Sequence, residues 1–237
     1  QKGGAWQPAM HLLREMNDTA ALDVSAPAPN AFTYTAALTA LCEAGRWEEA
    51  LRTYDAMPSS IERTEAVLQS AMKAAALGGQ WERAVALLRE LPSDGAAGPP
   101  RAAPYNLAIR ACAEAGQASS ALSAFRLMKL RGVRRSLLEY NGVLGALNAA
   151  GRWKAALYMI DEMKAERVRP TLVSYNLALG ACAKAARAEA AIELLSAMRA
   201  AGLEPDAVSY SSAIAASSRS ADVPKVLGLI GALEDQG

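Results

Sequence analysis

The sequence predicts an all-α fold, a solenoid of helix-turn-helix repeats of about 35 residues. Composition is the first reason. Apolar residues make up 52% of the 237 residues, but aromatic residues only 5%. The apolar content is therefore mostly Ala and Leu, which favour helices over strands. The second reason is a period, because tyrosines at 105, 140, 175 and 210 each follow the previous one by 35 residues. A fixed period of this length is typical of a solenoid.

Each repeat is expected to contain two helices. In residues 172–206, the first helix is predicted from about Ser174 to Lys184 and the second to about Ala200. Ala186 stands at the hairpin between them, where most other repeats have glycine. Glycine there supplies the left-handed residue that ends a helix. Neither helix can bury its apolar stripe alone, so neighbouring hairpins are expected to stack.

The phase of the repeats divides the chain. Residues 65–101 form a degenerate repeat, because Leu68 replaces the tyrosine and SDGAAGPP at 93–100 predicts a loop insertion. The predicted units are a partial repeat and linker at 1–30, repeats at 31–64, 65–101, 102–136, 137–171 and 172–206, and a C-terminal partial repeat at 207–237.

The repeat LVSYNLALGACAKAARAEAAIELLSAMRAAGLEPD at 172–206 resembles a pentatricopeptide repeat, and so do residues 137–171 and 31–57. Tetratricopeptide repeats fit poorly, because their Trp lies early in the first helix, whereas here it begins the second. The resemblance implies a right-handed α-solenoid that binds single-stranded RNA, one base per repeat. It also implies a role in RNA processing, stability or translation in a chloroplast or mitochondrion. No presequence is visible in this chain, which begins at Gln1.

By the same resemblance, the fifth and last residues of a repeat hydrogen-bond the base edge. Uracil offers an N3–H donor, which suits a carboxylate, whereas the N3 of cytosine accepts and suits a hydroxyl or amide donor. By this resemblance, uracil is assigned to Asn176 with Asp206 and cytosine to Asn106 with Ser136. A pyrimidine, more often cytosine, is assigned to Asn141 with Thr171. Purines are assigned to Thr35 with Thr64 and to Ser211 alone.

The resemblance assigns two further roles. The second residue of a repeat packs against the base face, and a cation near the end of the first helix contacts phosphate. Leu138, Val173 and Val208 suit the packing role, and Lys184 and Arg219 suit the phosphate role. Since both sets lie at or beyond residue 137, RNA contact is predicted there.

Structural explanations compete for the same residues. The tyrosines are expected in the core, and the tryptophans are expected to pack between helices. The three cysteines form no CxxC pair and are predicted to be buried packing residues. The asparagines have two readings, base recognition or satisfaction of free N–H groups at a helix start.

The sequence also limits the classes of function. It shows no nucleophile–base pair, glycine-rich phosphate loop or paired carboxylates, so neither an enzyme nor a cofactor is expected. No apolar stretch is long enough to span a membrane, so no membrane insertion is expected. A net charge of +1 supports nucleic-acid binding only weakly. Two alternatives therefore stay open, a structural subunit of a large organellar assembly such as a ribosome and a peptide-binding scaffold.

Overall fold

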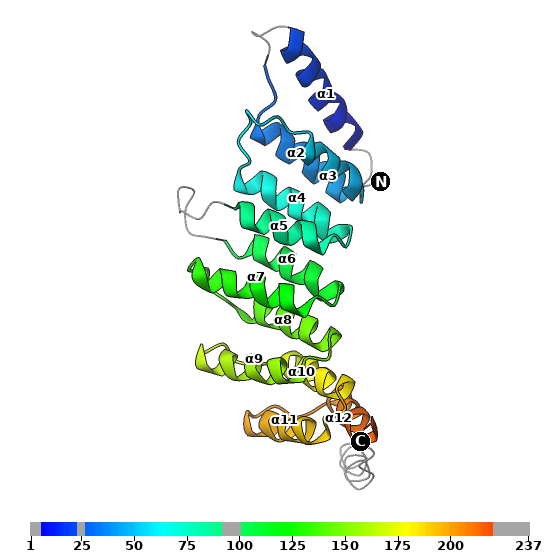
Figure 1. The fold of residues 1–237 in the computed structure, drawn as a ribbon, viewed down its shortest axis with the longest axis vertical. Helices are drawn as coiled ribbons and strands as arrows, with labels where there is room; N and C mark the ends of the chain where they lie inside the picture. Colours follow the sequence, from blue (N-terminus) through cyan, green and yellow to red (C-terminus); the bar gives the residue numbers. More distant parts are fainter. Residues whose placement is uncertain (1–5, 23–26, 92–100, 220–237) are drawn as a thin grey trace. The chain divides into compact units, whose positions relative to one another are not determined.

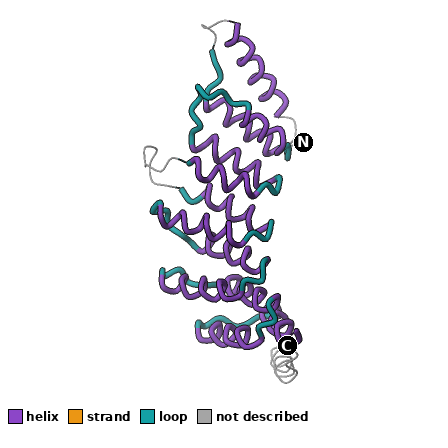
Figure 2. Tube along the Cα trace, viewed as in Figure 1, coloured by secondary structure: helices purple, strands orange, loops and turns teal. Residues whose placement is uncertain are grey.

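The computed structural model describes residues 6–22, 27–91 and 101–219. All regular structure in this part is helical (Figure 2). The chain divides into two compact units, residues 1–111 and 112–237, and the division falls inside α6 (Ala103–Glu114). The predicted fold class, an all-α solenoid, is confirmed.

The first unit begins with a single helix and continues as two helical hairpins (Figure 1). The first helices of the two hairpins, α2 and α4, pack against each other, and α1 packs on α2. The helices are α1 (Trp6–Leu22), α2 (Ala31–Glu43), α3 (Trp47–Asp55), α4 (Glu65–Leu77) and α5 (Trp81–Glu90). The predicted loop insertion at 93–100 lies outside the described residues.

In the second unit the first helices of consecutive repeats lie side by side, with α10 between α8 and α12. Helix α9 packs on α8 and α10, and α11 packs on α10 and α12 (Figure 1). Equivalent positions of α8, α10 and α12 are thereby brought into a row. The helices are α7 (Ala118–Leu130), α8 (Leu137–Ala149), α9 (Trp153–Ala165), α10 (Leu172–Lys184), α11 (Ala188–Ala200) and α12 (Ala207–Arg219).

The repeated aromatic and thiol side chains lie in the core, as predicted. Tyr140 and Tyr175 are completely buried, and Tyr34, Tyr105 and Tyr210 nearly so. Cys42, Cys112 and Cys182 are also buried, and burial raises the pKa of the Cys112 and Cys182 thiols to about 11. These thiols stay protonated at neutral pH, as expected for residues whose role is packing.

Two of the tryptophans show why this residue begins second helices. The indole of Trp47 covers Gly78 so closely that a Cβ there would lie 2.3 Å from the ring. Trp81 packs against a cluster that includes Ala75 and Ala84. The prediction that tryptophans pack between helices is therefore confirmed at both positions.

The hairpin turns need a left-handed residue. Gly151 supplies it between α8 and α9 with a φ of 62°, but Ala186 adopts a φ of 53° between α10 and α11. The side chain of alanine makes this conformation unfavourable.

Ala186→Gly should therefore raise the free energy of unfolding by about 0.5 to 1 kcal/mol, since relief of strain outweighs the greater entropy of an unfolded glycine. Gly151→Ala is the matched reverse change and should lower stability by a similar amount. Urea denaturation of both variants checks this, and a shift of both midpoints in the same direction would contradict it.

Candidate functional site

Two predicted base-reading residues of one repeat contact each other. Asn176 lies at position 5 of residues 172–206, on α10, and Asp206 is the last residue of that repeat, immediately before α12. The Asn176 Nδ2 donates to Asp206 Oδ1 at 3.1 Å and lies 3.3 Å from Oδ2. Both side chains are half-buried. Together they form one polar edge that carries an amide donor beside a carboxylate acceptor.

A third residue, which the sequence analysis missed, holds this pair in place. Ser209 is completely buried on the first turn of α12. Its Oγ lies 2.6 Å from Asn176 Oδ1 and 2.8 Å from Asp206 Oδ1, so its single proton serves one acceptor at a time. Its backbone N–H donates to Asp206 Oδ1 at 2.8 Å. Because Ser209 engages the Asn176 oxygen, the Asn176 NH₂ group is turned toward Asp206.

In the preceding repeat a serine again holds the asparagine. Ser174, also completely buried, donates to Asn141 Oδ1 at 2.7 Å. The Ser174 Oγ also accepts from the Thr171 backbone N–H at 3.1 Å and lies 3.2 Å from the Thr171 hydroxyl. Asn141 and Thr171 are therefore linked through Ser174, and no hydrogen bond joins these two described residues directly. The sequence signal is a serine that recurs 35 residues apart, one residue before a tyrosine.

The structure tests whether the asparagines cap helix starts. Asn141 and Asn176 each lie at the fifth residue of their helix, beyond the residues that cap a helix start. The capping alternative is therefore wrong for both. Ser136, the last residue of the repeat at 102–136, caps α8 instead: it immediately precedes the helix, and its side chain accepts from the Leu138 backbone N–H at 3.3 Å.

The remaining predicted base-reading residues are not arranged as a hydrogen-bonded pair like Asn176 and Asp206. Thr35 donates to the Ala31 carbonyl oxygen at 2.7 Å and Ser211 to that of Val208 at 3.1 Å, so both hydroxyl protons point into their own helices. Thr64 immediately precedes α4 but makes no capping hydrogen bond with its side chain. Asn106 lies half-buried on α6.

The predicted base-packing residues are exposed. Leu138, Val173 and Val208 lie on the first turns of α8, α10 and α12 and are 65%, 56% and 55% exposed. Phe32, which was not among the predicted residues, occupies the same position in residues 31–64 and is 79% exposed. Its place in the repeat could have identified it. Large apolar side chains that recur in solvent at one position are available to pack against a ligand.

The two predicted phosphate contacts lie at the ends of first helices. Lys184 ends α10 and is exposed, and its Nζ lies 3.5 Å from the Ala149 carbonyl oxygen at the end of α8. A cation there also interacts favourably with the dipole of α8. Arg219 ends α12, and its side chain lies outside the described part of the chain.

The Asp206 carboxylate is held in its charged form. Burial opposes ionisation, but hydrogen bonds from Ser209 and Asn176 outweigh burial and lower the pKa of Asp206. The group is therefore an acceptor at neutral pH, which suits it to an N–H donor.

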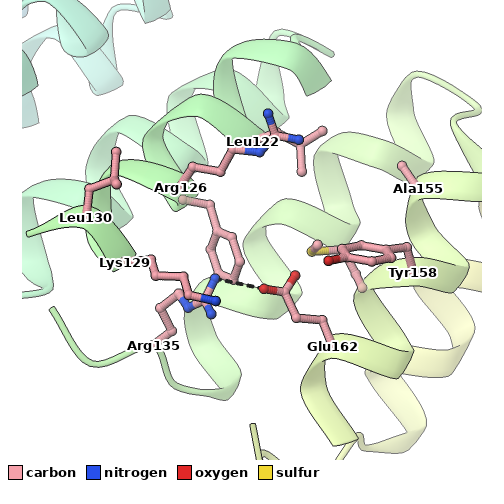
Figure 3. A pocket seen from close by; sticks show the side chains of 10 residues that line it. Leu122, Arg126, Lys129, Leu130, Arg135, Ala155, Tyr158 and Glu162 are labelled. Atoms are coloured by element: carbon pink, nitrogen blue, oxygen red, sulfur yellow. Dashed lines mark hydrogen bonds and ion pairs between the residues drawn. The ribbon is translucent and has the colours of Figure 1, made fainter. Parts of the chain in front are cut away.

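A buried cation lies away from this row, between α7 and α9 (Figure 3). The Arg135 side chain is 4% exposed, and its Nη1 lies 3.0 Å from Glu162 Oε1. Its Nη2 pairs with Glu166, and its guanidinium group lies 4.6 Å from the Phe125 ring centre.

Among the described residues, no cluster of His, Cys, Asp or Glu side chains could hold a metal ion, and no helix is long and apolar enough to cross a membrane.

Ser209→Ala should show what the missed serine contributes. The change leaves Asn176 and Asp206 without their shared donor, so the free energy of unfolding should fall by about 1 kcal/mol. Thermal unfolding measures this. Ser196→Ala is the control, because that exposed hydroxyl bonds only its own helix, at Ile192. An equal loss in both variants would contradict the assigned role.

Family models match most of the described chain. A pentatricopeptide repeat-containing protein model matches residues 20–128, a pentatricopeptide repeat domain model matches 125–185, and a PPR repeat family model matches 170–219. The chain belongs to the pentatricopeptide repeat family. No curated protein sequence matches it.

Solved pentatricopeptide repeat structures are similar over most of this chain. The crystal structure of maize PPR10 is 29% identical, with a TM-score of 0.66, over 97% of this chain and 34% of PPR10. PPR10 in complex with an 18-nt psaJ RNA element is 27% identical, with a TM-score of 0.55, over 97% and 33%. The chain thus spans about a third of the PPR10 structure. The PPR domain of the Arabidopsis thaliana protein-only RNase P 1, in complex with tRNA, shares the fold at 20% identity and a TM-score of 0.58, over 73% and 90%.

Proposed function

We propose that this pentatricopeptide repeat chain binds single-stranded RNA and reads one base per repeat along α8, α10 and α12. The observation that carries the proposal is the contact of Asn176 with Asp206, held by Ser209. The similarity to PPR10, which was solved with an 18-nt RNA element, supports the same function.

The geometry of this pair fits uracil. An amide nitrogen carries two N–H donors, and Asp206 occupies one of those of Asn176. The other is free to donate to a carbonyl oxygen of the base, while the Asp206 carboxylate accepts the N3–H of uracil. Cytosine has an acceptor at N3, which would face a carboxylate with no proton to share. Val173, exposed on the same helix, can cover the base face.

A binding measurement tests the proposal. Fluorescence anisotropy should show tighter binding to RNA in the order purine-N-pyrimidine-pyrimidine-U-purine than to a scrambled sequence. Asn176→Ala should weaken binding to the matched RNA by about tenfold. Glu193→Ala, on the exposed face of α11, is the control and should leave the affinity unchanged. Equal affinity for matched and scrambled RNA would rule out base reading.

The proposal extends to an organelle, where such a protein would act in RNA processing, stability or translation. The motif resemblance supports this extension, and the distribution of the tagged full-length protein between organelles and cytosol tests it. The net charge of +1 favours one alternative, a structural subunit of an organellar assembly. Stable co-purification with such an assembly after ribonuclease treatment would support that alternative.

A further inference from the structure

A niche recurs where consecutive repeats meet in the second unit. It combines the buried tyrosine at position 4 of one repeat with a basic residue at position 28 of the repeat before it. In the last copy, Arg199 Nη2 donates to the Tyr210 hydroxyl at 2.5 Å. The other two copies have Lys129 and Tyr140, and Lys164 and Tyr175, at these two positions.

The first niche is filled by a carboxylate of the chain itself. The Tyr140 hydroxyl donates to Glu166 Oε2 at 2.9 Å, and Lys129 Nζ lies 3.7 Å from Glu166 Oε1. Arg135 pairs with the same carboxylate. Burial opposes the charge, but the Tyr140 hydrogen bond and the Arg135 charge prevail and lower the pKa of Glu166. This niche therefore stabilises an ionised carboxylate.

The second niche lacks that carboxylate. Ala201 stands 35 residues after Glu166, at the equivalent position. A pocket of about 340 Å³ lies there, lined by Tyr175, Ala201 and three basic residues, Lys164, Arg167 and Arg169. Tyr175 is 0% exposed, and its hydroxyl has no hydrogen-bond partner among the described residues. A buried hydroxyl in that condition is unfavourable unless a ligand satisfies it.

The charge around this pocket is one-sided. No acidic residue lines it, and neither Arg167 nor Arg169 pairs with an acid in the described chain. Lys164 is half exposed and lies 3.6 Å from Asp161, which is itself exposed. Arg167 adopts a φ of 59°, where the neighbouring repeats have Gly132 and Gly202. A bulky cation thus occupies a strained position at the edge of the pocket.

We propose that the pocket at Ala201 binds a carboxylate supplied in trans, an Asp or Glu side chain of a partner protein. The carboxylate would accept from the Tyr175 hydroxyl, as Glu166 does from Tyr140, and would pair with Lys164, Arg167 and Arg169. The filled niche one repeat earlier favours a carboxylate over a phosphate. The inference does not depend on RNA binding, since none of the predicted base-reading residues lines the pocket.

NMR titration tests the pocket with a small probe, N-acetyl-glutamate N′-methylamide, whose only charge is the side-chain carboxylate. Saturable shifts of the Val168 and Ala201 backbone amides are expected, and the corresponding glutamine compound should cause none. Tyr175→Phe removes only the hydroxyl and should weaken binding about tenfold. The absence of saturable shifts in the wild-type protein would overturn the proposal.

Ala201→Glu separates the site from general charge effects. Ala201 is exposed, so the substitution needs no space in the core. The new carboxylate should fill the pocket in cis, abolish probe binding and raise the melting temperature. Ala200→Glu adds the same charge one residue away and should do neither. Inorganic phosphate that binds more tightly than the glutamate probe, and loses affinity in Tyr175→Phe, would reassign the pocket to phosphate and overturn the carboxylate proposal.

Discussion

Arg135→Met should lower the free energy of unfolding by about 3 kcal/mol. The variant keeps an apolar side chain against Phe125 but removes the cation that pairs with Glu162 and Glu166. The two carboxylates then lose their main partner while still partly buried, with Glu162 16% and Glu166 30% exposed. Urea denaturation at neutral pH measures the loss as a lower midpoint.

The loss should depend on pH. The pKa of Glu166 is lower in the folded protein, so its ionisation stabilises the fold above the unfolded pKa, and this contribution disappears as pH falls through the folded pKa. The difference between wild type and Arg135→Met should therefore shrink in acid. Arg134→Met, an exposed neighbour, is the control and should change stability little at any pH. A constant difference across the acid range would contradict the assignment.

Asp206→Ser should change which base is preferred at this repeat, from uracil to cytosine. Serine removes the carboxylate that, under the proposed function, accepts the N3–H of uracil, and it supplies a hydroxyl that can donate to the N3 of cytosine. The ratio of affinities for RNAs that differ only at that base should change by about tenfold or more. Paired anisotropy titrations with the two RNAs measure this ratio.

The fold should survive this change, because serine caps a helix start about as well as aspartate. Ser136 already does so at α8. Asp206→Ala is the informative comparison, since it removes the cap and the base acceptor together and should lower both stability and affinity. If Asp206→Ser keeps the uracil preference of the wild type, Asp206 does not read the base.

The period allowed the fold to be predicted. Tyrosines at a constant interval placed the core, and the Ala-Gly pairs placed the hairpins, because both are local consequences of residue type. The left-handed Ala186 followed from the same alignment. Base reading by the asparagines stays a prediction. The sequence paired Asn176 with Asp206 as readers of one base, and their hydrogen bond to each other was not predicted.

The interactions that the sequence analysis missed are not local. A serine inside a helix has no distinctive signal, and the role of Ser209 depends on Asn176, 33 residues earlier. In the sequence, Arg135 is likewise only one of several basic residues. Its role appears in the fold, where α9 brings Glu162 and Glu166 beside it. The pocket at Ala201 exists because Ala201 is smaller than Glu166, its counterpart one repeat earlier. The size difference can be read from the sequence, but the pocket it leaves beside Tyr175 depends on how the helices pack.

The link from Ser209 to Asn176 has a consequence for modular engineering. The asparagine belongs to one repeat, but the hydroxyl that orients it belongs to the next, and the same is true of Asn141 and Ser174. Under the proposed function, a recognition unit therefore extends past its own 35 residues into the first turn of the next repeat. Grafts that cut at the repeat boundary would separate each asparagine from the serine that orients it, whereas cuts after that first turn would keep the two residues together.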